Sequence, residues 1–167
     1  MRKSALLLVA VSLLIAADKR KETDAEKKEQ KELQGVWLLV SSETNGKPMP
    51  AKEVKTTKLI FFSGNKYNYK QAGGTRLGTI RLDPEAKPKT MEIVAQQLIS
   101  AEKYEKGNYY SCIYEIDGDQ LKICLALPGS PKPTEFASTG GKCVQVWKRE
   151  KAKQGTGSKG QGTEKKN

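Results

Sequence analysis

Three cysteines and a scattered set of carboxylates are the residues of this 167-residue chain that could do chemistry. The chain contains no histidine, which removes His-based acid–base pairs, Ser–His and Cys–His nucleophiles and the most common metal ligand. Cys112, Cys124 and Cys143 lack the Cys-x-x-Cys spacing of zinc and thiol-redox sites. The sequence therefore predicts a protein that is not an enzyme and that holds no metal and no cofactor.

The acidic residues form no recognisable catalytic motif. Glu92, Glu115 and Glu135 lie in or near expected strands, and an acid pair of glycosidase type is the catalytic alternative that they leave open. Two glycine pairs, at 73–74 and 140–141, could suggest phosphate loops. No helix is expected after either pair, so we interpret both as hairpin turns.

Residues 33–150 follow the two-residue period of β-strands. Short segments rich in β-branched and aromatic residues alternate with turn-forming residues such as Asn45-Gly46 and Gly73-Gly74. We expect an all-β domain, an eight-stranded antiparallel up-and-down barrel, with a β-sandwich as the competing architecture. The expected strands are 35–43, 57–62, 66–71, 75–82, 90–95, 109–116, 120–127 and 142–149.

Both ends of the chain differ in composition from this barrel domain. Residues 1–17 join a basic start to an apolar run too short for a transmembrane span, which is typical of a secretory signal peptide, with an uncleaved anchor as the alternative. Residues 18–32 are almost all charged, and Thr23 and Glu26 have capping-box spacing, so we expect a short solvated helix or a disordered spacer. Residues 151–167 are expected to be a disordered basic tail. The protein is thus expected to be exported, periplasmic or extracellular, without stable membrane insertion after signal cleavage.

The formal net charge of +11 is not concentrated on the barrel domain. Residues 148–167 carry seven basic and two acidic groups, whereas residues 18–32 carry six of each. A nucleic-acid-binding domain gathers basic and aromatic residues on one face of its folded part. We therefore expect a soluble monomer that does not bind nucleic acid.

The hairpin around residues 117–119 fixes which way two cysteines point. The more apolar set is even-numbered in 109–116 and odd-numbered in 120–127, so even positions must face odd ones across the hairpin. A two-residue loop gives this pairing, either Asp117-Gly118 or Gly118-Asp119. Cys112 is then expected to point inward and Cys124 outward.

The last expected strand adds the third cysteine. If Val144 and Val146 face the core, Cys143 points outward beside Cys124 on the neighbouring strand. We therefore expect a Cys124–Cys143 disulfide, with three free thiols as the alternative.

Six spaced segments of the barrel domain carry a family likeness. They are LQGVW at 33–37, NGKPMP at 45–50, LDPEAKPKTMEI at 82–93, YEIDGDQLKIC at 114–124, KPTEF at 132–136 and VQVWKRE at 144–150. Together they resemble a planctomycete-enriched family of small exported lipocalin-like domains of unknown function. The resemblance implies an eight-stranded barrel of the lipocalin-like (calycin) type, export and no assigned activity.

The lipocalin likeness also implies how one end of the barrel is closed. In lipocalins a tryptophan of the first strand plugs one end, and a basic residue late in the last strand packs over it. By this resemblance Trp37 is the plug, and Arg149 or Lys148 is the cation. We interpret this pair as structural and not as a ligand site.

Alternation read outward from Trp37 predicts the barrel interior. Such side chains either fill an eight-stranded barrel or line a small apolar cavity. We expect non-catalytic binding of a small, partly apolar molecule at the open end, with Phe61, Tyr67, Tyr69 and Tyr114 in the lining and residues 127–138 as one lip. The competing hypothesis is a structural or protein-interaction module of the periplasm or cell surface with a fully packed barrel. The expected interior residues are Trp37, Leu39, Ser41, Leu59, Phe61, Tyr67, Tyr69, Ile80, Leu82, Met91, Ile93, Tyr114, Leu121 and Ile123.

Overall fold

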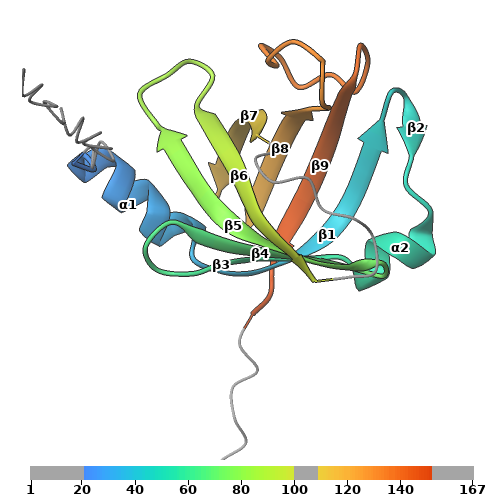
Figure 1. The fold of residues 1–167 in the computed structure, drawn as a ribbon, viewed down its shortest axis with the longest axis horizontal. Helices are drawn as coiled ribbons and strands as arrows, with labels where there is room; N and C mark the ends of the chain where they lie inside the picture. The colour runs from blue at the N-terminus through green and yellow to red at the C-terminus, as the bar shows by residue number, and fades with distance from the viewer. Residues whose placement is uncertain (1–20, 100–108, 152–167) are drawn as a thin grey trace, which may run out of the picture.

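A closed antiparallel β-barrel of eight strands dominates the computed structural model, which describes residues 21–99 and 109–151 (Figure 1). The elements are α1 (Asp24–Leu33), β1 (Gly35–Thr44), β2 (Lys47–Pro48), α2 (Ala51–Thr56), β3 (Lys58–Phe61), β4 (Lys66–Gln71), β5 (Gly74–Asp83), β6 (Thr90–Ile99), β7 (Tyr109–Asp117), β8 (Gln120–Ala126) and β9 (Lys142–Arg149). Strands β1 and β3–β9 pair in chain order, and pairing of β1 with β9 closes the barrel. The short β2 extends the sheet beside β1.

The expected all-β barrel is therefore confirmed, and the sandwich alternative is wrong. Each expected strand overlaps an observed one, although β5 and β6 are longer than the alternation indicated. The sequence did not predict β2 or α2, because both are very short and α2 has no buried residue that would give it a helical period. The expected signal peptide and almost all of the expected tail lie outside the described residues.

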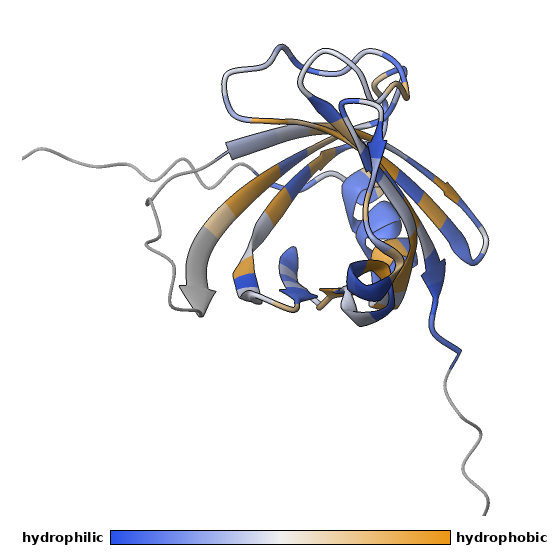
Figure 2. Ribbon diagram, turned by 90° about the vertical axis from the view of Figure 1, so that its right-hand side faces the viewer, coloured by the Kyte–Doolittle hydropathy of each residue, from blue (hydrophilic) through white to orange (hydrophobic). Residues whose placement is uncertain are grey.

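In most strands buried side chains alternate with more exposed ones, as their sequences indicate, although β7 and β8 also bury consecutive residues. Figure 2 shows this as hydrophobic and hydrophilic bands that alternate along the strands. Most of the expected interior residues belong to the observed core. The core residues buried inside the barrel are Leu33, Trp37, Leu39, Leu59, Phe61, Tyr67, Ile80, Leu82, Met91, Cys112, Tyr114, Leu121, Ile123 and Trp147.

A β-bulge in β1 makes the prediction for Ser41 wrong. Leu39 pairs with Trp147 of β9, but Ser41 pairs with Val146, so one residue of β1 is extra. That residue is Val40, which is 55% exposed. Beyond the bulge the alternation shifts by one position, so Ser42 is buried and Ser41 is exposed.

Strand β9 presents the opposite face from the one the sequence suggested. Trp147 is fully buried, and Gln145 and Cys143 are buried on the same face of the strand. Val144 and Val146 lie on the outer face and are half-buried. The apolar side chains on both faces of β9 are the reason that alternation alone could not orient it.

The reversed face of β9 rules out the expected Cys124–Cys143 disulfide. Cys124 pairs with Val144, and Cys143 pairs with Leu125, so the two thiols lie on opposite faces of the sheet. All three cysteines are buried and free. The hairpin prediction is correct: Asp117 pairs with Gln120 across a Gly118-Asp119 loop, and Cys112 lies in the core.

Of the two structures expected for residues 18–32, a helix and a disordered spacer, the helix forms as α1. The capping box is present, since Thr23 Oγ1 accepts from the amide of Glu26 at 3.1 Å and the Glu26 carboxylate accepts from the amide of Thr23 at 2.7 Å. The helix lies against the end of β5 (Figure 1) and is not fully solvated. Glu29 is buried and accepts from Lys89 Nζ at 2.7 Å, and Leu33 enters the core.

The barrel end beneath α1 is closed by Trp37 and Arg149. Trp37 is fully buried, and its indole Nε1 donates to the carbonyl of Leu33 at 2.8 Å. The Arg149 guanidinium lies 4.1 Å from the centroid of a Trp37 ring. Its two terminal nitrogens donate to the carbonyls of Gln34 and Glu32, each at 2.6 Å. One cation thus covers the indole and satisfies carbonyls at the C-terminal end of α1.

Arg149, and not Lys148, is the cation over the ring. Lys148 sits on the opposite face of β9 and is exposed. Gly35 in the LQGVW segment makes room for the guanidinium, because a Cβ atom there would lie 3.3 Å from Nη1 of Arg149. Its φ of 120° also strongly favours glycine.

We expect the closed end to dominate stability. Trp37→Ala should lower the free energy of unfolding by about 3–5 kcal/mol because a fully buried ring is lost. Arg149→Ala should lower it by about 2–4 kcal/mol through loss of the carbonyl hydrogen bonds and the cation–π contact. Lys148→Ala, the matched control, should change it by less than about 0.5 kcal/mol. Urea denaturation measures all three, and equal losses for the Arg149 and Lys148 variants would contradict the assignment.

The register also predicts the state of the thiols. After unfolding under non-reducing conditions, the protein should react with a thiol reagent at Cys112, Cys124 and Cys143, because no two of them lie on the same face of adjacent strands. Mass spectrometry of the alkylated chain checks this. A Cys124–Cys143 link in the folded protein would show that the register of β9 is wrong.

Candidate ligand-binding cavity

The barrel is packed at the Trp37 end but hollow at the other. A cavity of about 280 Å³, here named the barrel cavity, opens where β4, β8 and β9 meet the turns farthest from Trp37. Its wall is mainly apolar and aromatic. The lining residues are Thr44, Leu59, Tyr67, Tyr69, Arg76, Ile93, Tyr110, Ile123, Leu125, Leu127, Pro128, Cys143 and Gln145.

The size of the barrel cavity suits a small organic molecule. Ligand pockets measure about 300–1,000 Å³, and an apolar cavity of about 150 Å³ is enough for benzene. A volume of about 280 Å³ therefore suits a compact molecule of about two fused rings.

Two neighbouring strands bring an aromatic ring and a cation together in the wall. Tyr69 of β4 pairs with Arg76 of β5 across a two-residue turn at Ala72-Gly73, so both side chains share the inner face. The guanidinium carbon of Arg76 lies 5.8 Å from the centroid of the Tyr69 ring. The Tyr69 ring also meets Trp147 edge to face, with centroids 6.1 Å apart. Packing against Trp147 and Arg76 thus holds the Tyr69 ring in the wall.

Among the described residues of the wall, Arg76 is the only one with a charged side chain. Burial raises the pKa of Tyr69 above its ordinary value, with nearby Arg76 opposing the shift, so its hydroxyl stays protonated at neutral pH. Gln145 is buried beside it, and Cys143 Sγ lies 3.4 Å from Ser42 Oγ. Neutral donors and acceptors of this kind orient a ligand inside a mainly apolar pocket.

The structure brings together only two of the four residues expected to line the site. Tyr67 and Tyr69 are in the wall of the barrel cavity. Phe61 packs in the core towards the Trp37 end, where it pairs with Gly35. Tyr114 is buried near Glu29 of α1, and burial, reinforced by that carboxylate, raises the pKa of its hydroxyl.

Its position along β7 explains why Tyr114 does not line the barrel cavity. Tyr110 shares its face and lines the barrel cavity, but it lies four residues nearer the open end. At about 3.3 Å per residue this separates the two by roughly 13 Å. On β7 alternation predicts the face of each tyrosine correctly, but it says nothing about which end of the barrel is hollow.

Sequence reasoning also missed Arg76, Gln145 and Cys143. The signal for Arg76 was available, because the turn after Tyr69 contains Gly73 and a two-residue loop would pair the two residues. Gln145 and Cys143 were missed because the face of β9 was reversed.

The segment expected to form one lip of the open end does so only at its start. Leu127 and Pro128 line the barrel cavity. The rest packs on the outside of the barrel, where Pro133 is fully buried and Cys124 Sγ donates to the carbonyl of Ala137 at 3.5 Å. Lys122 Nζ lies 4.7 Å from the Phe136 ring centroid. This segment therefore covers the outer face of β7 and β8 more than the opening.

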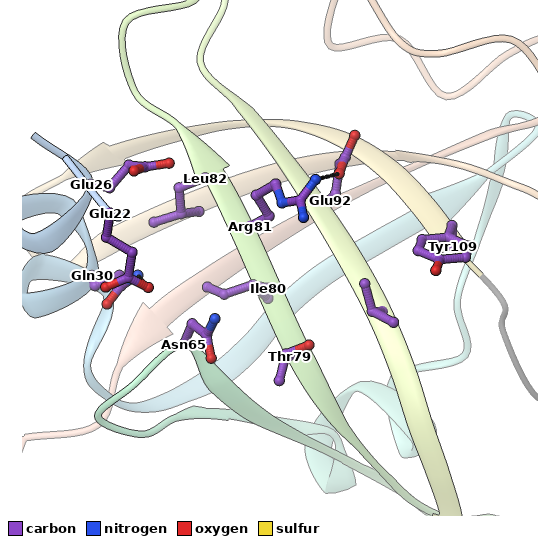
Figure 3. Close-up of a pocket in the computed structure, with 11 residues that line it drawn as sticks. Glu22, Glu26, Gln30, Asn65, Thr79, Ile80, Arg81, Leu82, Glu92 and Tyr109 are labelled. Carbon is purple, nitrogen blue, oxygen red and sulfur yellow. Dashed lines mark hydrogen bonds and ion pairs between the residues drawn. The ribbon is translucent and has the colours of Figure 1, made fainter. Parts of the chain in front are cut away.

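A second hollow lies between α1 and strands β5 and β6 (Figure 3). It is larger, about 340 Å³, and is lined mostly by polar and charged side chains. Arg81 of β5 and Glu92 of β6 pair with each other along its sheet wall at 3.8 Å, and Glu26 is engaged in the helix cap. These groups already have partners and face an open trough. The trough is therefore a weaker ligand site than the barrel cavity.

The acid pair left open by the sequence does not form at the barrel cavity. Glu92 lies in the trough, and Glu92, Glu115 and Glu135 are all exposed. Within residues 21–99 and 109–151, no group of three or more potential metal-ligating side chains is placed to hold a metal ion. In the same part of the chain, no helix has the length and apolar character needed to span a membrane.

Comparisons with protein-family models, with curated proteins and with solved structures find no match to this chain.

Proposed function

We propose that this protein binds a small, partly apolar molecule in the barrel cavity and does so without catalysis. The observation that carries the proposal is the hollow end of an otherwise packed barrel. Leu59, Ile93, Ile123 and Leu125 line it with apolar surface. Side chains from all eight strands of the barrel converge on one space, which is the usual construction of a small-molecule site.

The apolar wall of the barrel cavity favours binding of a partly apolar molecule. Apolar surface removed from water stabilises a complex by about 25 cal/mol per Å². A molecule that replaces water beside Ile93 and Leu125 gains this contribution, while Tyr69 and Gln145 offer it polar partners. The cavity speaks against the competing hypothesis of a fully packed interaction module, which requires side chains to fill this space.

The types of side chain in the wall of the barrel cavity support ligand binding without catalysis. No carboxylate is among the described residues that line the barrel cavity. The Cys143 thiol has Ser42 as its neighbour, and no histidine exists in the chain to act as its base. A general base within hydrogen-bond reach is one of the usual ways to activate a nucleophile, and histidine is not available here to supply it.

Binding of a neutral two-ring molecule tests this proposal. We expect saturable one-to-one binding of 2-naphthamide in isothermal titration calorimetry. Leu125→Trp should weaken it at least about tenfold, because the larger side chain fills the barrel cavity. Val40→Trp is the matched control, since Val40 lies on the outer face, and it should leave binding unchanged. Equal loss in both variants, or absence of binding by both 2-naphthamide and its anionic counterpart 2-naphthoate, would refute a site inside the barrel.

We further propose that the chain is exported and belongs to the lipocalin-like family that its six segments resemble. The basic start and short apolar run of residues 1–17 support export. The intact mass of the protein purified from its own host should correspond to a chain that begins after Ala17. A mass that includes residues 1–17 would contradict cleavage.

A further inference from the structure

We propose that the ligand of the barrel cavity is an apolar carboxylate whose anionic group binds Arg76. This inference rests on the proposed function, because it names the class of molecule for the same site. It starts from the charge of the wall. Arg76 is the only charged side chain among the described residues that line the barrel cavity.

Arg76 has no carboxylate partner within the described part of the chain. The other arginines of the barrel do: Arg81 pairs with Glu92 at 3.8 Å, and Arg149 lies 3.5 Å from Asp119. Arg76 instead lies beside the Tyr69 ring, a contact that leaves its fork of N–H donors available. An intermediate exposure places it partly out of water, where an ionic hydrogen bond is stronger than on an open surface.

The position of Arg76 sets the orientation of the ligand. Arg76 is near the start of β5, at the open end, whereas Leu59 pairs with Trp37 and lies towards the closed end. Ile123 likewise belongs to both the wall and the packed core. A bound molecule would therefore keep its charge at the mouth and its apolar body towards the core.

The chemistry of guanidinium favours a carboxylate at this point. Its planar fork can give a carboxylate two parallel hydrogen bonds, which adds geometric specificity to charge. The neutral Tyr69 hydroxyl and the Gln145 amide lie beside it and can donate further hydrogen bonds. No acidic side chain among the lining residues described would repel such an anion. An aliphatic or an aromatic body would both satisfy the apolar wall.

Two isosteric ligands test the charge requirement separately from binding itself. At neutral pH and low salt, 2-naphthoate is an anion and 2-naphthamide is neutral, although their shapes match. We expect the wild-type protein to bind 2-naphthoate at least about tenfold more tightly in isothermal titration calorimetry. Octanoate should likewise bind more tightly than octanamide if the body can be aliphatic, and equal affinities for that pair would restrict the class to aromatic acids.

Three variants test whether Arg76 causes the preference for 2-naphthoate over 2-naphthamide. Arg76→Gln should bind both naphthalene ligands with the wild-type affinity for the amide, so that the preference disappears. Arg76→Lys keeps the positive charge but lacks the planar guanidinium, so it should retain part of the preference. A partial preference in this variant shows that loss of preference in Arg76→Gln is not caused by misfolding. Arg81→Gln is the matched control, because Arg81 lies on the same strand but faces outward, and it should keep the full preference.

The possible results distinguish failure of the carboxylate inference from failure of the proposed binding function. Equal affinities of the wild-type protein for 2-naphthoate and 2-naphthamide would overturn the carboxylate inference and leave the proposed binding function standing. A preference that survives in folded Arg76→Gln would overturn the assignment to Arg76. Failure of both ligands to bind the wild-type protein would overturn the binding function and this inference with it.

Discussion

The contact of Arg149 with Trp37 and the end of α1 is the interaction on which the rest of this structure depends. Every other strand of the barrel pairs with a neighbour in the chain, but closure requires β1 to meet β9. The hydrogen bond from Arg149 to Gln34 joins positions 115 residues apart. Such long-range pairing carries the largest cost in chain entropy. One arginine offsets part of this cost by binding the indole, the first strand and the helix end together.

Sealing one end determines where a ligand can go. Trp37, Leu33 and the helix above them exclude water from that end, so the hollow part of the barrel lies at the opposite turns. The bulge at Val40 then rotates the rest of β1, which turns Ser42 towards Cys143 near the barrel cavity. The LQGVW segment, which carries the sequence signal for the fold, is thus remote from the candidate site. Its glycine and tryptophan serve closure alone.

Local patterns explain how much of the fold was predictable. Alternation and turn residues predicted the strands, and a two-residue loop within 117–119 predicted which faces of β7 and β8 meet. The structure shows that, of the two possible loops, Gly118-Asp119 forms. The predictions that were wrong, for Ser41 and for the face of β9, required knowledge of how one strand pairs with its neighbours. A single extra residue at Val40 reversed the faces of Ser41 and Ser42, and β9 has apolar side chains on both faces. The candidate site was half predictable for the same reason, since Tyr67 and Tyr69 follow from alternation but the place of the cavity depends on how side chains fill the barrel.

The central claim is that this barrel has one sealed end and one binding end. Titration of the ¹⁵N-labelled protein with 2-naphthoate tests it most directly, because amide shifts report which end the ligand contacts. The predicted result is a set of shifts at Thr44, Tyr69, Arg76 and Gln145 with none at Leu33 or Trp37. Shifts centred on Trp37 and α1, or on the trough beside β5, would contradict it.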